Sequence, residues 1–335
     1  MLKDLLGDLL FTTNAVMPIV AMVAVGYFLK KLKIITTGGA KEMNKLVFKL
    51  FLPVLLFLNV YNIESFAGID FWYVGFVCIV VVLVFCLALF SVRFVTDDPR
   101  KKGAWVQATF RSNYALIGIP LATSIFGASG SALATILSAF TIPLFNILAV
   151  IALSIYSDEE NKKPNVKEIA LDIIKNPLID AIALGAAMLL VRALFVEWGI
   201  DFRISSEKSL QWFYSALTQI SKVATPLALI VLGANFEFSA IPSMKKEIIS
   251  GVAVRCVVTP IIGLSLAFLI GGFSGAEFAA FVSVFGTSVA VSTVPMAQEM
   301  DSDAELAGQL VVWTTVISAL TLFVFIYALR AIGIF

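Results

Sequence analysis

Long apolar stretches separated by short polar segments recur along the whole chain. A membrane-spanning helix needs about 20 mostly apolar residues. Ten stretches of about that length occur, at residues 11–32, 44–63, 71–93, 104–126, 131–156, 176–198, 213–235, 248–271, 276–298 and 305–330. We therefore predict an all-α polytopic membrane protein with ten transmembrane helices, called spans 1 to 10 below.

The two groups of five spans repeat the same spacing of prolines, glycines and polar residues. Pro18 and Gly26 in span 1 match Pro177 and Gly185 in span 6. The longest match has four residues in each half: Lys49, Pro53, Asn62 and Glu64 in span 2, and Lys222, Pro226, Asn235 and Glu237 in span 7. Two consecutive repeats with an odd number of spans must face opposite ways across the membrane. The pattern predicts inverted repeats at 1–156 and 176–335, joined by a cytoplasmic linker at 157–175.

Spans 4 and 9 each contain a proline near mid-membrane that follows a run of small and polar residues. Proline removes a backbone hydrogen bond, and exposed backbone is tolerated at membrane depth only where protein or a water-filled cavity covers it. We predict that both helices are broken and together form the binding site, where half-helix N-termini favour an anion. The predicted substrate-binding residues are Asn113, Tyr114, Gly118, Pro120, Ser288, Ser292, Thr293 and Pro295. The simpler alternative is that the prolines only kink packed helices.

Ionisable residues inside spans are candidates for function. Asp180 in span 6 is a candidate for proton or cation coupling, and its alternative is a residue near the interface that reaches water. Arg111 in span 4 is a candidate for compensating substrate charge, and its alternative is a side chain that reaches the inner interface. Arg255 in span 8 has no evident partner in the sequence.

Several of these residues together resemble a known family. Asn113, the Gly118-Ile119-Pro120 turn, Leu52-Pro53, Asn176-Pro177 and Val294-Pro295 are similar to the auxin efflux carrier family, which includes the plant PIN auxin carriers and bacterial permeases for malate or malonate. The resemblance implies a fold like that of bile acid symporters and sodium/proton antiporters. Spans 1, 2, 6 and 7 would form a dimeric scaffold, and spans 3–5 and 8–10 a transport domain in which spans 4 and 9 cross. It also implies a weak-acid substrate at that crossing, bound in part by Asn113. Plant members carry a Pro-Gln-Gly run where this chain has residues 290–293, so auxin itself is not the predicted substrate.

Composition and charge narrow the function further. The chain is 60% hydrophobic and 14% charged and contains no histidine, and its three cysteines lie in apolar runs without ligand spacing. No metal, cofactor, nucleic acid partner or enzymatic activity is therefore predicted, and no Walker A sequence indicates an ATP-driven pump. With the N-terminus outside, the inner loops hold 15 lysines and arginines and the outer segments five. This excess predicts a multi-pass protein of the cell (inner) membrane with both termini outside the cytoplasm.

The sequence therefore favours a secondary transporter of a small organic anion, a mono- or dicarboxylate, which moves by alternating access. A proton or sodium ion is the expected coupling ion, and a homodimer the expected assembly. Two alternatives stay open: a metabolite-binding membrane receptor of the same fold, and a cation/proton antiporter. The antiporter would need paired carboxylates at the crossing, and no acidic residue lies within ten residues before either proline.

Overall fold

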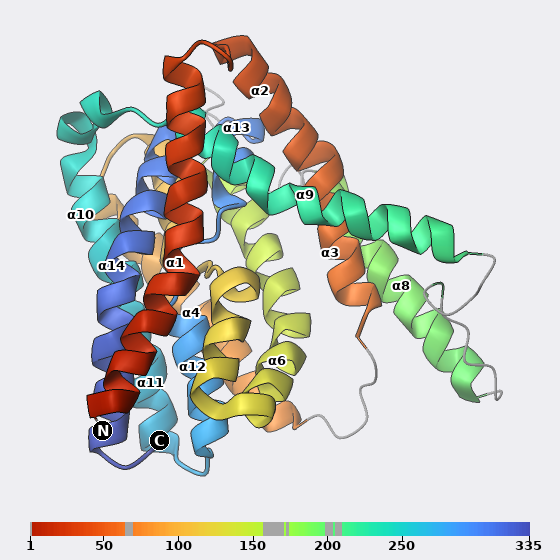
Figure 1. Ribbon diagram of the computed structural model, residues 1–335, viewed down its shortest axis with the longest axis vertical. Helices are drawn as coiled ribbons and strands as arrows, with labels where there is room; N and C mark the ends of the chain where they lie inside the picture. The colour runs from red at the N-terminus through yellow and green to blue at the C-terminus, as the bar shows by residue number, and fades with distance from the viewer. Residues whose placement is uncertain (1, 64–69, 157–170, 172–173, 198–203, 205–209) are drawn as a thin grey trace.

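The computed structural model describes residues 2–63, 70–156, 171, 174–197, 204 and 210–335. Glu64 and most of the predicted linker 157–175 lie outside these residues. The described chain is helical apart from its connections and one isolated bridge between extended residues (Figure 1). Its helices are α1 (Leu2–Lys31), α2 (Thr37–Leu46), η1 (Val47–Phe51), α3 (Leu52–Tyr61), α4 (Phe71–Ser91), η2 (Val92–Phe94), α5 (Pro99–Phe110), η3 (Tyr114–Gly118), α6 (Ile119–Ile155), α8 (Pro177–Glu197), α9 (Gln211–Asn235), η4 (Phe238–Met244), α10 (Lys245–Ala253), η5 (Val254–Val258), α11 (Thr259–Ile270), α12 (Gly275–Gly286), α13 (Thr293–Glu299) and α14 (Ala304–Ala331).

Seven helical segments of the described chain are long and apolar enough to cross a membrane. They are Thr37–Tyr61, Phe71–Phe94, Tyr114–Ile155, Pro177–Phe195, Gln211–Asn235, Phe238–Ile270 and Ala304–Ala331. Large apolar side chains such as Ile79, Leu190 and Leu269 are exposed on their surfaces, as expected for helices in lipid. The all-α polytopic membrane protein is confirmed in this form, and the number of ten spans stays a prediction.

Three wide π-helical turns each lie just before a proline. η1, η3 and η5 each end two residues before a proline: Pro53, Pro120 and Pro260. A proline has no N–H for the carbonyl four residues earlier, and its ring collides with that carbonyl. Widening the preceding turn relieves the collision without ending the helix. These prolines therefore widen their helices locally, and each helix continues beyond them.

Glycines let pairs of helices touch backbone to backbone. A Cβ atom on Gly26 of α1 would overlap the carbonyl of Ile230 in α9, and one on Gly233 of α9 would overlap the carbonyl of Val23 in α1. In the same way Gly185 of α8 lies against Phe57 and Val60 of α3. Small residues allow this close approach, which drives helix association in lipid. These glycines allow two closely packed helix pairs, α1 with α9 and α3 with α8.

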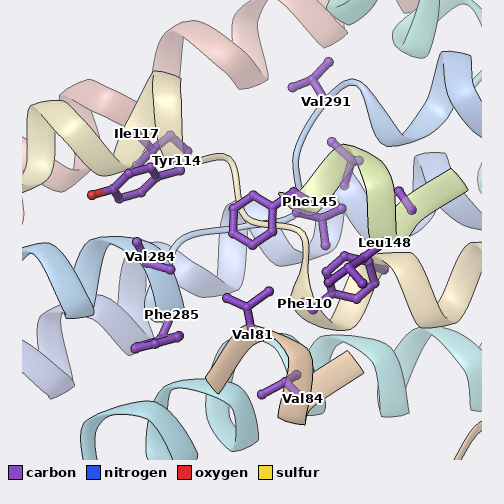
Figure 2. Close-up of a cluster of buried hydrophobic side chains, with 14 of the residues drawn as sticks. Val81, Val84, Phe110, Tyr114, Ile117, Phe145, Leu148, Val284, Phe285 and Val291 are labelled. Carbon is purple, nitrogen blue, oxygen red and sulfur yellow. The ribbon is translucent and has the colours of Figure 1, made fainter. Parts of the chain in front are cut away.

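The buried core lies among α4, α5, α6, α12 and α14. Figure 2 shows part of it, with Val81 and Val84 of α4 facing Phe110, Phe145 and Val284 from three other helices. The rings of Phe85, Phe110 and Phe145 form a chain, with centroids 5.3 Å and 6.4 Å apart. Phe110 is the last residue of α5, so the end of that helix is anchored in this aromatic packing.

Candidate functional site

Two helices stop in the interior of the molecule, and their extended continuations bind each other. α5 ends at Phe110 and α12 at Gly286, and residues 111–113 and 287–292 are not helical. Ser112 and Val289 form an antiparallel bridge, in which the Asn113 N–H donates to the Ser288 carbonyl at 2.8 Å. The Ala290 N–H donates to the Arg111 carbonyl at 3.1 Å. Each break therefore satisfies backbone groups of the other, as buried backbone requires. We call these two segments the crossing.

The side chains of the crossing are far less satisfied than its backbone. Ser112 Oγ, Asn113 Nδ2, Ser288 Oγ and Thr293 Oγ1 are buried and have no hydrogen-bond partner within the described structure. Most buried polar atoms are bonded, and an unsatisfied one costs about 1–3 kcal/mol. Two of these residues, Ser112 and Asn113, also line the pocket described below, where a polar ligand can satisfy their groups.

Arg111 lies in the crossing and does not reach the surface, since only 2% of it is exposed. Its Nη2 donates to Asn146 Oδ1 at 2.7 Å, and its Nη1 contacts Gln107 Oε1 at 3.4 Å and Met296 Sδ at 3.0 Å. All three partners are neutral, and no described carboxylate pairs with the guanidinium. An arginine stays protonated in proteins, so the site contains a buried positive charge without a counter-ion. The interpretation that Arg111 extends to the interface is wrong.

A pocket of about 80 Å³ opens beside these groups, and we call it the crossover pocket. That space is several times the 10–15 Å³ or so that one water needs. Its polar lining residues include Asn59, Arg111, Ser112, Asn113, Asn146, Thr225 and Ser292. Its apolar lining residues include Leu52, Leu55, Leu56, Leu178 and Ala228. Among the described residues of the lining there is one cation and no carboxylate.

The structure brings only part of the predicted site together in this pocket. Asn113, Tyr114, Ser292 and Arg111 line it. Ser288 and Thr293 are buried at the crossing but do not line the pocket. The remaining candidates are not in the lining: Gly118 and Pro295 are buried, and Pro120 and Asp180 are exposed. At Gly118 a Cβ atom would overlap the Tyr114 ring, so that glycine serves close packing.

Arg255 holds the two broken helices together, a role that the sequence did not indicate. It is fully buried in η5, and its Nε donates to the Thr287 carbonyl at 2.8 Å. Its Nη1 donates to the Thr109 carbonyl at 3.3 Å and its Nη2 to the Val284 carbonyl at 3.0 Å. These carbonyls belong to the last turns of α5 and α12, where unpaired acceptors carry partial negative charge. One cation therefore caps both C-terminal ends.

Two larger cavities lie on either side of the crossover pocket. The termini-side cavity, of about 610 Å³, shares Asn59, Ala115 and Ile142 with the pocket. Its lining residues in α6 include Ala132, shortly after Phe126, whose ring contacts Phe335 at the C-terminus. Both termini are at the same end of the molecule (Figure 1), so we call this the termini side. The far-side cavity, of about 630 Å³, lies at the opposite end and shares no lining residue with the pocket. The crossover pocket is therefore adjacent to one cavity and separated from the other.

Two broken helices that meet at a pocket inside a bundle of membrane helices are typical of a membrane transporter. Residues 11–326 match the family described as "Membrane transport protein", and the chain belongs to that family. The resemblance to auxin efflux carriers is thereby confirmed, and a transporter rather than an enzyme is indicated.

Two relatives support this membership. An uncharacterized transporter of Methanothermobacter thermautotrophicus is 23% identical over 93% of this chain and 96% of its own length. An uncharacterized transporter of Methanocaldococcus jannaschii is 24% identical over 92% of this chain and 96% of its own length.

Proposed function

We propose that the protein is a secondary transporter of a small organic monoanion, which binds in the crossover pocket and moves by alternating access. The observation that carries the proposal is the buried, uncompensated charge of Arg111 beside the unpartnered amide of Asn113. An isolated buried charge is costly, and an anion that pairs with it recovers much of that cost.

The lining supports a monocarboxylate over a dicarboxylate. Arg111 is the single cation among the described lining residues, which also include several leucines such as Leu52 and Leu55. A second carboxylate would find no second cation there, and burying a charge without a counter-charge is unfavourable. A carboxylate with a short apolar chain fits a lining that combines one cation with apolar side chains. The absence of acidic groups from this lining also weighs against the antiporter alternative.

Matched glycines support the proposed inverted repeats. Gly26 in span 1 packs on α9, which contains span 7, and its repeat partner Gly185 in span 6 packs on α3, which belongs to span 2. Equivalent positions thus contact equivalent helices with the partners exchanged, as a pseudo-two-fold axis requires. Ten spans in two five-helix repeats, with spans 4 and 9 crossing at residues 111–113 and 287–292, remain our proposed architecture.

Assembly and coupling complete the proposal. The proposed assembly is a homodimer that forms through spans 1, 2, 6 and 7. Cross-linking in native membranes tests it, and recovery of monomer alone would contradict it. Asp180 is exposed and lies away from the crossover pocket, so a proton or sodium ion coupled through Asp180 would bind outside the pocket.

A thermal-shift screen of the purified protein tests the substrate. The panel contains sodium acetate, butyrate, hexanoate and benzoate against malonate and succinate, with sodium chloride at equal ionic strength as control. We expect monocarboxylates to raise the melting temperature, because a ligand that binds only the folded state stabilises it. Arg111→Gln should abolish these shifts without lowering the melting temperature of the free protein, since it removes an uncompensated buried charge. Shifts by dicarboxylates alone, or equal shifts in Arg111→Gln, would contradict the proposal.

A further inference from the structure

Asn44 in α2 is a buried amide that nothing in the structure satisfies. It is 1% exposed, and neither its Oδ1 nor its Nδ2 has a hydrogen-bond partner among the described residues. An unsatisfied buried polar group costs about 1–3 kcal/mol, which packing alone does not explain. Asn44 lies outside the crossing and lines none of the three cavities described above.

One face of the helix α2–η1–α3 connects all three cavities. Lys41 lines the far-side cavity, Leu52 the crossover pocket, and Asn59 both the pocket and the termini-side cavity. Asn44 and Phe48 lie between Lys41 and Leu52 at the helical spacing of three or four residues, and both are buried. The closed layer between the crossover pocket and the far-side cavity therefore contains Asn44 and Phe48.

The opposite wall of this layer shows the same order. On α9, Leu232 lines the far-side cavity and Ala228 the crossover pocket. At α13, Val294 lines the far-side cavity, while Val291 just before the helix lines the pocket. α2 and η1 pack against both α9 and α13, and Figure 1 shows these helices together at the end opposite the termini. Three elements thus close the pocket on this side.

We infer that this layer is the far-side gate of the transport path and that the Asn44 amide is a second binding station for the anion. When α2 and α13 separate, the Asn44 side chain lies between the pocket and the far-side cavity. Its Nδ2 can then donate to a carboxylate that leaves Arg111. The identity of the ligand as an anion rests on the proposed function. The position of the gate rests only on which residues line the crossover pocket and the far-side cavity.

The melting temperature of an Asn44 variant distinguishes a ligand-binding role of Asn44 from a structural role. Asn44→Leu replaces an unpartnered amide by an apolar group of similar size, so the melting temperature should rise. The matched control is Asn176→Leu, because Asn176 is also buried but its Oδ1 accepts from the Leu178 N–H at 3.0 Å. The melting temperature of this variant should fall. A fall with Asn44→Leu as large as that of the control would show that Asn44 is a bonded structural residue and would overturn the inference.

Cysteine labelling tests the gate without any substrate. Asn44→Cys and Phe48→Cys are made with Cys78 and Cys86 replaced by alanine and the buried Cys256 retained as an internal reference. A water-soluble methanethiosulfonate reagent is added, and labelling is read by mass spectrometry. Minor conformations are commonly populated at about 0.1–10%, so both cysteines should label at roughly that fraction of the rate of the exposed neighbour in Lys45→Cys. Rates as low as that of Cys256 would mean that the layer does not open.

Transport tests the station itself. Asn44→Leu in proteoliposomes should leave the thermal shifts by the panel monocarboxylates unchanged but reduce their uptake roughly fivefold or more, the effect of one lost hydrogen bond. Unchanged uptake would exclude a station at Asn44. If no carboxylate shifts the wild-type protein, the proposed function fails while the stability and labelling results still decide the gate.

Discussion

At the scale of single residues, the same side chain has different roles in different surroundings. Arg111 and Arg255 are both fully buried arginines in apolar stretches. Arg255 donates to three backbone carbonyls and is satisfied by the fold, whereas Arg111 has only neutral side-chain partners and faces the crossover pocket. The first therefore stabilises the structure, and the second is available to a ligand.

Asn113 allows the sharpest test at this scale. Asn113→Ala should weaken binding of the panel monocarboxylates about 5- to 150-fold, because a ligand acceptor loses its buried donor at a cost of about 1–3 kcal/mol. The fold should persist, since the Asn113 amide makes no side-chain hydrogen bond in the structure. The measurement compares binding and melting temperature on one preparation.

Asn62→Ala is the matched control for Asn113→Ala. The Asn62 Oδ1 accepts from the Tyr214 hydroxyl at 3.1 Å, and Asn62 lines the termini-side cavity rather than the pocket. Its variant should lose a little stability and almost no affinity. Normal binding by Asn113→Ala together with weak binding by Asn62→Ala would move the site away from the crossing. Ser292→Ala should have a smaller effect than Asn113→Ala, since water in the pocket can replace its hydroxyl. Thr293→Ala should also have a smaller effect, because Thr293 does not line the pocket.

At the scale of elements, the breaks after α5 and α12 do not coincide with Pro120 and Pro295, the two prolines from which the breaks were predicted. The chain leaves the helix at residues 111–113, re-forms a wide turn in η3 and only then reaches Pro120. In the second half, Pro295 lies inside α13, just after the break at 287–292. Pro120 and Pro295 therefore lie near the breaks but not at them, and the breaks themselves are lined by the packing of Phe110 and the hydrogen bonds of Arg255.

Arg255 should be essential for the stability of the crossing. Arg255→Leu leaves the carbonyls of Thr287 and Val284 without their guanidinium donor, and each unsatisfied buried acceptor costs about 1–3 kcal/mol. We expect a large fall in melting temperature, measured in detergent. Arg255→Lys keeps the charge with fewer directed donors and should fall between wild type and Arg255→Leu. Equal stability of all three proteins would contradict the capping role.

Gly26 tests the packing of α1 on α9. Gly26→Ala adds a methyl group that overlaps the Ile230 carbonyl, so it should lower the melting temperature. Gly75→Ala in α4 is the matched control, because a Cβ atom there meets no other atom within 4 Å. That variant should be neutral or stabilising, since alanine favours a helix over glycine by up to about 1 kcal/mol. A reversed order of the two melting temperatures would show that α1 and α9 are not in backbone contact.

At the scale of the whole molecule, the structure is asymmetric between its two ends. The crossover pocket shares lining residues with the termini-side cavity and is closed from the far-side cavity. Both termini lie at the same end (Figure 1). The proposed alternating access requires the opposite arrangement as well, with the layer at Asn44 and Phe48 open and the termini side closed.

Orientation in the membrane is the prediction at this scale. With both termini outside, a cysteine appended after Phe335 should react with an impermeant reagent in intact cells. Lys245→Cys, exposed at the far end, should stay protected until the cells are opened. The basis is the excess of lysine and arginine in the predicted inner loops. Labelling in the reverse pattern would invert the assigned faces and leave the fold untouched.

The sequence alone determined the class of fold, indicated the two helices that break and singled out Asn113 as a candidate binding residue, a role that stays a prediction. Hydropathy is a property of about 20 consecutive residues, so it can be read along the chain, and proline acts on its own helix turn. Which polar groups are satisfied was decided only by the tertiary structure. Arg255 finds Thr109 at a distance of 146 residues in sequence, and Asn44, Asn113 and Asn62 differ only in what surrounds them. Hydrogen-bond partners depend on neighbours in space, and only folding brings those neighbours together.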